Sequence, residues 1–210
     1  MTTLPALRLT RALRNAVLFT DPGDYIPSLN AVRLQMTDDR LVLDATDRYK
    51  LLRQELDLPE PAPAGPVVVS RSALLALVKS VEAAVREGWV KRDRNTIQAQ
   101  VRLVEGLQVQ LPTVTEFSAP ALDLADSAYP AVERLLTMPH LPTDHPVGLN
   151  GKHLRAFADV RVEAGKAPWW RMTVHGRDGR PVMTHWTVES DVERHSCVAL
   201  LMPVRFEGDA

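Results

Sequence analysis

The chain has 210 residues, of which 45% are apolar and 24% are charged, and its formal net charge is -1. This composition predicts one or two packed domains and argues against a tail that only coats nucleic acid, although a balanced total can still divide into a basic and an acidic face. The single cysteine, Cys197, excludes an internal disulfide and is typical of a reducing compartment. No apolar run approaches the ~20 residues that span a bilayer, and the first residues show no signal-peptide pattern. We therefore expect a cytoplasmic protein that makes no use of a membrane.

Residues 1–58 predict a helix followed by strands. Leu9, Leu13, Ala16 and Val17 recur at helical spacing, with Thr10 as a candidate N-cap. A Pro-Gly turn ends this helix, and alternating apolar residues then predict strands in residues 32–36 and 41–58.

Residues 59–66 contain four prolines and predict a linker, because proline suits neither a helix interior nor a central strand. The segment from 67 to 136 repeats the first pattern. Its helix has apolar residues on one face, and strands follow in residues 97–103 and 107–111. Residues 112–146 hold six prolines and predict an interdomain connector, within which residues 129–136 could dock.

Residues 147–210 predict a third unit. Asn150 is the expected helix N-cap, and strands are expected in residues 170–174, 181–186 and 197–204. The order predicts an α+β fold of repeated helix-plus-strands units, with helices on one face of antiparallel sheets. We predict a domain of two half-units over 1–136 (1–58 and 67–136) and a half-domain over 147–210.

Two distant stretches carry the most specific pattern. Residues 45–51 read Ala-Thr-Asp-Arg-Tyr-Lys-Leu and residues 201–206 read Leu-Met-Pro-Val-Arg-Phe. Together they resemble the two halves of the protein-binding pocket of the bacterial DNA polymerase III β subunit, the sliding clamp. Weaker matches at residues 27–32, 128–136, 147–150 and 178–182 occur in the family's order, so the resemblance covers nearly the whole chain.

The resemblance implies a DNA clamp fold of about three half-domain units, with helices lining a central hole and sheets outside. It implies a non-enzymatic processivity factor without cofactors, which encircles or cradles duplex DNA without sequence specificity. The expected partners are DNA polymerase, other clamp-binding peptides, a clamp loader and further copies of the chain.

The departures from the family concern the ring. A standard bacterial clamp chain has three domains, and the resemblance implies that this sequence holds no counterpart of the first domain or of the opening half of the last. A closed dimeric ring is therefore not expected. More subunits, half-domains completed across chains, or a partner clamp remain open. Arg48 stands where many clamps have glycine, and Tyr49 where His or Phe is common, which would alter peptide specificity.

Each expected helix carries two basic residues that the resemblance assigns to phosphate contacts: Arg11, Arg14, Lys79, Arg86, Lys152 and Arg155. Such contacts are loose, salt-sensitive and independent of sequence. The plain alternative is an ordinary solvated helix face, since Glu82 and Asp159 dilute two of the patches.

The resemblance also implies an apolar pocket for partner peptides, made of Leu29, Thr46, Arg48, Tyr49, Lys50, Leu51, Leu200, Met202, Pro203 and Val204. Methionine suits such a pocket because its thioether repacks around related ligands. Leu200 and Met202 could instead be core strand residues.

Other functions receive little support. Asp44 and Asp47 would point to opposite faces of a strand, which disfavours an acid–base pair. The histidines and Cys197 lack the paired spacing of a zinc site. The rivals to a clamp are an interaction protein that titrates clamp partners without forming a ring, and a small hydrolase or nuclease, for which we find no nucleophile with its base.

Overall fold

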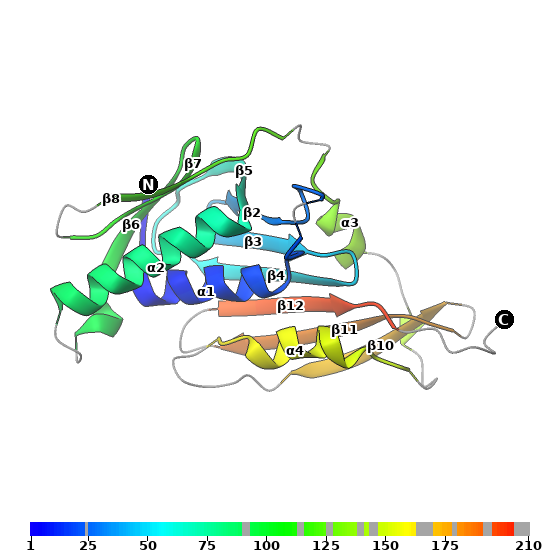
Figure 1. Cartoon of the computed structure of the whole chain (residues 1–210). Coiled ribbons are helices and arrows are strands. Elements are labelled where there is room, and N and C mark those ends of the chain that lie inside the picture. The colour runs from blue at the N-terminus through cyan, green and yellow to red at the C-terminus, as the bar shows by residue number, and fades with distance from the viewer. Residues whose placement is uncertain are drawn as a thin grey trace.

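The computed structural model describes residues 1–23, 25–89, 93–112, 116–124, 128–137, 141–142, 147–162, 170–177, 180–190 and 195–203. Two antiparallel sheets are partly covered by three long helices (Figure 1). Within the described residues, no helix combines the length and the apolar character needed to cross a membrane.

Unit 1 contains β1 (Thr2–Pro5), α1 (Ala6–Leu18), β2 (Ala31–Met36), β3 (Arg40–Thr46) and β4 (Lys50–Asp57). Helix α1 begins earlier than predicted, because β1 leads directly into it at Pro5. Thr10 is therefore no N-cap: it is buried inside the helix, and its hydroxyl donates to the carbonyl of Leu7 at 3.2 Å.

Unit 2 contains β5 (Ala64–Ser70), α2 (Arg71–Gly88), the short η1 (Arg94–Thr96), β6 (Gln98–Leu103), β7 (Gly106–Gln110) and β8 (Glu116–Pro120). Ser70 caps α2 by accepting the N–H of Ala73 at 3.2 Å. Strand β5 begins inside the segment predicted to be a linker. It is an edge strand of its sheet, so the missing N–H of Pro66 breaks no hydrogen bond between central strands.

Unit 3 contains β9 (Leu141–Pro142), α4 (Gly151–Asp159), β10 (Arg171–Arg177), β11 (Arg180–Ser190) and β12 (His195–Leu201), and the helix α3 (Val132–Leu136) precedes it. Asn150 caps α4 as predicted, accepting the N–H of Lys152 at 2.9 Å. The turn predicted between β10 and β11 falls partly on residues 178–179, which lie outside the described residues.

Units 1 and 2 exchange their first strands. One sheet has the order β1-β6-β7-β8, and the other has the order β5-β2-β3-β4-β12-β11-β10-β9. Unit 3 extends the sheet of unit 1, because β12 pairs antiparallel with β4 from His195 opposite Leu56 to Leu201 opposite Lys50.

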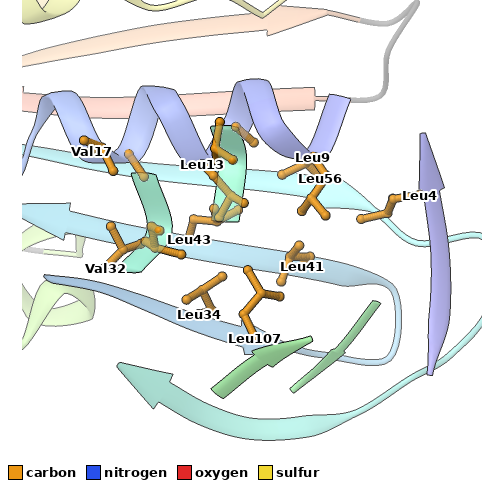
Figure 2. Packing of buried hydrophobic residues seen from close by; sticks show 14 of the residues in the cluster. Leu4, Leu9, Leu13, Val17, Val32, Leu34, Leu41, Leu43, Leu56 and Leu107 are labelled. Atoms are coloured by element: carbon orange, nitrogen blue, oxygen red, sulfur yellow. The ribbon is translucent and has the colours of Figure 1, made fainter. Parts of the chain in front are cut away.

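The main core lies between the helices and the two sheets. Leu9 and Leu13 of α1 meet Leu41, Leu43 and Leu56 on the strands beneath them (Figure 2), and all five are fully buried. Burial of one such side chain contributes roughly 1.5–3 kcal/mol.

A buried polar network joins unit 3 to unit 1. The side-chain amide of Asn15 donates to Gln54 Oε1 at 3.0 Å and to the carbonyl of Arg161 at 2.7 Å, and Asn15 Oδ1 accepts the N–H of Arg161 at 2.9 Å. Gln54 Nε2 donates to the carbonyl of Ala12 at 2.8 Å. The network therefore links α1, β4 and the segment that follows α4.

The predicted α+β fold of repeated helix-plus-strands units is confirmed. Strand β1, strand β8 and helix α3 were not predicted. The division into a domain over 1–136 and a half-domain over 147–210 stays a prediction.

Candidate functional site

The structure brings together the two stretches that carry the sequence pattern. Strand β12 places Leu200 opposite Leu51 and Leu201 opposite Lys50. Beyond the strand, the N–H of Met202 donates to the carbonyl of Tyr49 at 2.8 Å. A turn early in the chain and the end of the last described strand are thus in direct contact.

The turn between β3 and β4 is held by its own side chains. Asp47 Oδ1 accepts the N–H groups of Tyr49 and Lys50 at 3.0 and 2.9 Å. The Thr46 hydroxyl donates to the carbonyl of Lys50 at 2.9 Å and accepts the N–H of Arg48 at 3.2 Å.

Arg48 has a φ of 82°, which lies in the left-handed region. A side chain there costs roughly 1–2 kcal/mol, so glycine is the natural occupant. This conformation gives a physical reason for the glycine that many clamps have at this position, and in this chain the bonds from Thr46 and Asp47 brace the turn around Arg48.

The floor of the site is a small apolar cluster separate from the main core. Its buried members are Leu51, Tyr129, Val132 and Leu200, with Leu136 packed against them. Leu200 is 7% exposed and thus belongs to this buried cluster, in line with the alternative that it is a core residue.

Three large apolar side chains nearby are exposed to solvent. Tyr49 is 56% exposed, Met202 is 54% exposed and Leu135 is 39% exposed. We call the turn 46–51, helix α3 and residues 200–203 the junction site. Of the other residues predicted for the pocket, Pro203 is half-buried, Leu29 is buried but outside the apolar cluster, and Val204 lies outside the described residues.

Helix α3 is the part of this site that the sequence-derived set of pocket residues missed. The Tyr129 hydroxyl donates to the carbonyl of Asp44 at 2.6 Å, and Arg53 forms ion pairs with both Asp44 and Glu133. The apolar spacing of Val132, Leu135 and Leu136 after the Tyr-Pro pair was the available signal.

Electrostatics keep these anchoring groups in one protonation state. Burial and the nearby Asp44 carboxylate raise the pKa of Tyr129, so its hydroxyl stays a donor. Burial opposes the charge of Arg53, but its hydrogen bonds to Asp44 and Glu133 outweigh that effect and raise its pKa.

The turn also contacts α4 of unit 3. The Tyr49 and His153 rings stack with centroids 5.1 Å apart, and His153 Nδ1 lies 4.0 Å from Asp47 Oδ2. Lys50 forms an ion pair with Asp47, and its Nζ lies 5.7 Å from the centre of the Phe19 ring. Unit 3 therefore holds the turn from two sides, through β12 and through α4.

The six basic residues predicted to contact DNA lie on three helices of one layer, with α1 between α2 and α4 (Figure 1). Lys79, Arg86, Lys152 and Arg155 are exposed. Arg14 is held by Glu82 through two hydrogen bonds of 2.8 and 2.6 Å, which raise its pKa.

The contacts of Arg11 and Arg155 reduce the positive charge that the helix layer presents to solvent. Arg11 is half-buried, and its guanidinium donates to the carbonyl of Val162 at 3.3 Å. Arg155 lies 3.7 Å from Asp159 one helical turn away. The dilution by acidic neighbours that the sequence suggested is thus present in the structure.

The residues considered for catalysis or metal binding have other surroundings. Asp44 is buried between Arg33 and Arg53, and Asp47 braces the turn. Cys197 is buried, and burial raises the pKa of its thiol. His140 and His145 lie outside the described residues, as do the side chains of His185 and His195. No group of three metal-ligating side chains occurs within the described part of the chain.

No protein-family model and no curated protein matches this sequence. Solved structures do. A Pseudomonas aeruginosa DnaN sliding clamp bound to griselimycin matches 97% of this chain with a TM-score of 0.64 and 15% identity, and this chain covers 65% of that clamp. The chain has the sliding-clamp fold.

Two further structures show the same fold. A putative DNA polymerase III β subunit from Eubacterium rectale matches 97% of the chain at a TM-score of 0.62 and 10% identity, again over 65% of its own length. A. fulgidus PCNA bound to the C-terminal region of FEN-1 matches 99% of the chain and 99% of its own length, at a TM-score of 0.61 and 11% identity. The chain thus spans about two thirds of the length of the bacterial clamps. The family resemblance read from the sequence is confirmed at the level of the fold.

Proposed function

We propose that this chain is a sliding-clamp-like processivity factor, which holds duplex DNA without sequence specificity and tethers a polymerase at the junction site. The observation that carries the proposal is the meeting of residues 46–51 with residues 200–203 within a clamp fold. In this proposal the protein binds and positions its partners and performs no covalent chemistry.

The junction site has the chemistry of a peptide-binding surface. Met202, Leu135 and Tyr49 offer apolar contacts to a partner, and they lie beside a buried apolar floor. The N–H groups of Arg48, Tyr49 and Lys50 are used within the turn, but its carbonyl oxygens can accept a further hydrogen bond and so fix the register of a bound peptide. Structures of the same fold hold griselimycin in one case and the C-terminal region of FEN-1 in another.

The helix layer has the chemistry of a loose DNA-binding face. Lys79 and Arg86 lie on one exposed stripe of α2, and Lys152 and Arg155 lie on α4. Long basic side chains on a rigid layer attract phosphates without reading bases. A clamp loader and a ring of several chains belong to the same proposal.

The peptide site is tested by Met202→Asp. Burial of a methionine at an interface contributes roughly 1.5–3 kcal/mol, so its loss should weaken binding about tenfold or more. The probe is a fluorescent peptide copied from the carboxyl-terminal tail of a bacterial DNA polymerase III, and binding is measured by anisotropy.

The matched control is Val104→Asp, since Val104 is 57% exposed in the β6–β7 turn, outside the junction site. We expect wild-type affinity for this control. Equal affinity of Met202→Asp and wild type would refute the placement of the peptide site. A titrating protein without a ring would bind the peptide but would not be retained on circular DNA.

A further inference from the structure

Units 1 and 2 complete each other within one chain. Each gives its first strand to the other's sheet, β1 to β6 and β5 to β2, and α1 packs against α2. The inward side chains of β2 and β6 are consequently at most 7% exposed: Val32, Leu34, Met36, Ala99, Val101 and Leu103.

Unit 3 has the same inward face, but that face is only partly covered. Strand β10 is its counterpart of β2 and β6, being the first strand after the helix. Met172 of β10 lies opposite Trp186, whose ring is 5.0 Å from that of Phe157 in α4, so Met172 faces the helix side. Met172 is 43% exposed, and Val174 and Trp170 are half-buried.

Unit 3 shows no complete strand exchange among its described residues. Among the described strands, β9 pairs with β10 only at His175 and Gly176. Residues 147–149, which lead directly into α4 as β1 and β5 lead into α1 and α2, contain only an isolated bridge at Gly148. A donor segment and an acceptor edge therefore occur together in the same unit.

We propose that two copies of this chain pair through unit 3 and complete a second clamp domain, as units 1 and 2 do within one chain. Residues 147–149 of each copy add to β10 of the other, and Met172 and Val174 become buried between the two copies. The partner is a second copy because one unit supplies both the donor and the acceptor, which makes the surface self-complementary about a two-fold axis.

The inference rests on the fold, and only the ring size rests on the proposed function. Two paired chains contain three complete domains. A ring with the six domains of two three-domain clamp chains would therefore take four copies of this chain. Such a ring also needs β8 edges of neighbouring pairs to meet, because β8 is the outer strand of the four-stranded sheet.

The test is the solution mass of the full chain by light scattering at about 10 µM. We expect twice the chain mass of 23.3 kDa, or an even multiple of it. Met172→Asp should give the single-chain mass, whereas Val104→Asp, which is similarly exposed outside unit 3, should keep the wild-type mass.

A second variant guards against misfolding of Met172→Asp. Strands β2 and β6 contact each other between units 1 and 2, and the proposal gives the two β10 strands of a pair the same relation. A short bis-maleimide should therefore cross-link the cysteine of Met172→Cys to the same cysteine of the second copy. Val104→Cys should not be cross-linked, and the native Cys197 is buried. A wild-type monomer, or dimers that are cross-linked equally at both positions, would overturn the proposal. A dimer that Met172→Asp leaves unchanged would also overturn the proposal, because the face of unit 3 at Met172 would then be covered by residues of its own chain or by another protein. Peptide binding is measured on Met172→Asp as well. Unchanged affinity would show that the outcome of the pairing test is independent of the peptide site.

Discussion

Replacing Asn15 by Ala tests whether unit 3 is held to unit 1 by the buried polar network. Asn15 is 2% exposed, and it makes three hydrogen bonds that join α1 to Gln54 of β4 and to Arg161 after α4. The variant removes all three of these hydrogen bonds from Gln54 and from the backbone of Arg161.

The magnitude follows from the surroundings of those partners. Arg161 is half-buried, so water can replace part of what its backbone groups lose. Gln54 is fully buried, although its Oε1 also lies 3.6 Å from the Cys197 sulfur and keeps that weak donor. An unsatisfied buried polar group costs about 1–3 kcal/mol, so we expect Asn15→Ala to lower the free energy of unfolding by about 2 kcal/mol.

Urea unfolding measures this change, as a lower midpoint at an unchanged slope. Hydrogen exchange should also quicken in β12 and at its β4 partners, because the network lies directly beside that pair. The control is Asn95→Ala, since Asn95 is exposed and its loss should change stability by less than about 0.5 kcal/mol. An Asn15→Ala protein as stable as this control would refute the role of the network.

Two other variants test the anchoring of α3 and the helix face. Tyr129→Phe removes the bond to the Asp44 carbonyl and should cost about 1 kcal/mol. The pKa of Tyr129 is raised above its ordinary 10.0, so the stabilisation by its protonated hydroxyl is complete below pH 10 and is lost as the pH rises further. In urea titrations at alkaline pH, wild type should therefore lose more stability than Tyr129→Phe. Parallel losses in the two proteins would contradict this. Replacing both Lys79 and Arg86 by Ala should lower the slope of log K against log salt for duplex DNA by about 0.9 for each phosphate that these two side chains neutralise. Arg102→Ala is the control, because Arg102 lies on the outward face of β6, and an equal drop in both proteins would count against the helix face.

Local patterns were sufficient to predict the three long helices α1, α2 and α4 and most strands. Leu74, Leu77 and Val81 mark the buried face of α2, and Asn150 caps α4, because these signals act within a few residues. Strand β1 was missed because it has four residues and ends in Pro5, and the start of β5 was missed because Pro66 is tolerated only at a sheet edge.

Long-range features could not be predicted from periodicity. The pairing of β4 with β12 joins residues far apart in the sequence, and only the family resemblance suggested that the two ends meet. The burial of Asn15 and Gln54 depends on partners from three elements, so neither residue stood out in the sequence. The left-handed backbone at Arg48 was signalled only by the glycine that many clamps have at this position.

Retention on circular DNA tests the clamp proposal most directly. The full chain is loaded onto nicked circular duplex DNA with the clamp loader of its own cell, washed in moderate salt, and the DNA is then linearised. We predict that the protein stays on the circle and leaves after linearisation, because a clamp holds DNA by encircling it more than by binding it. Equal release before and after linearisation would contradict this account.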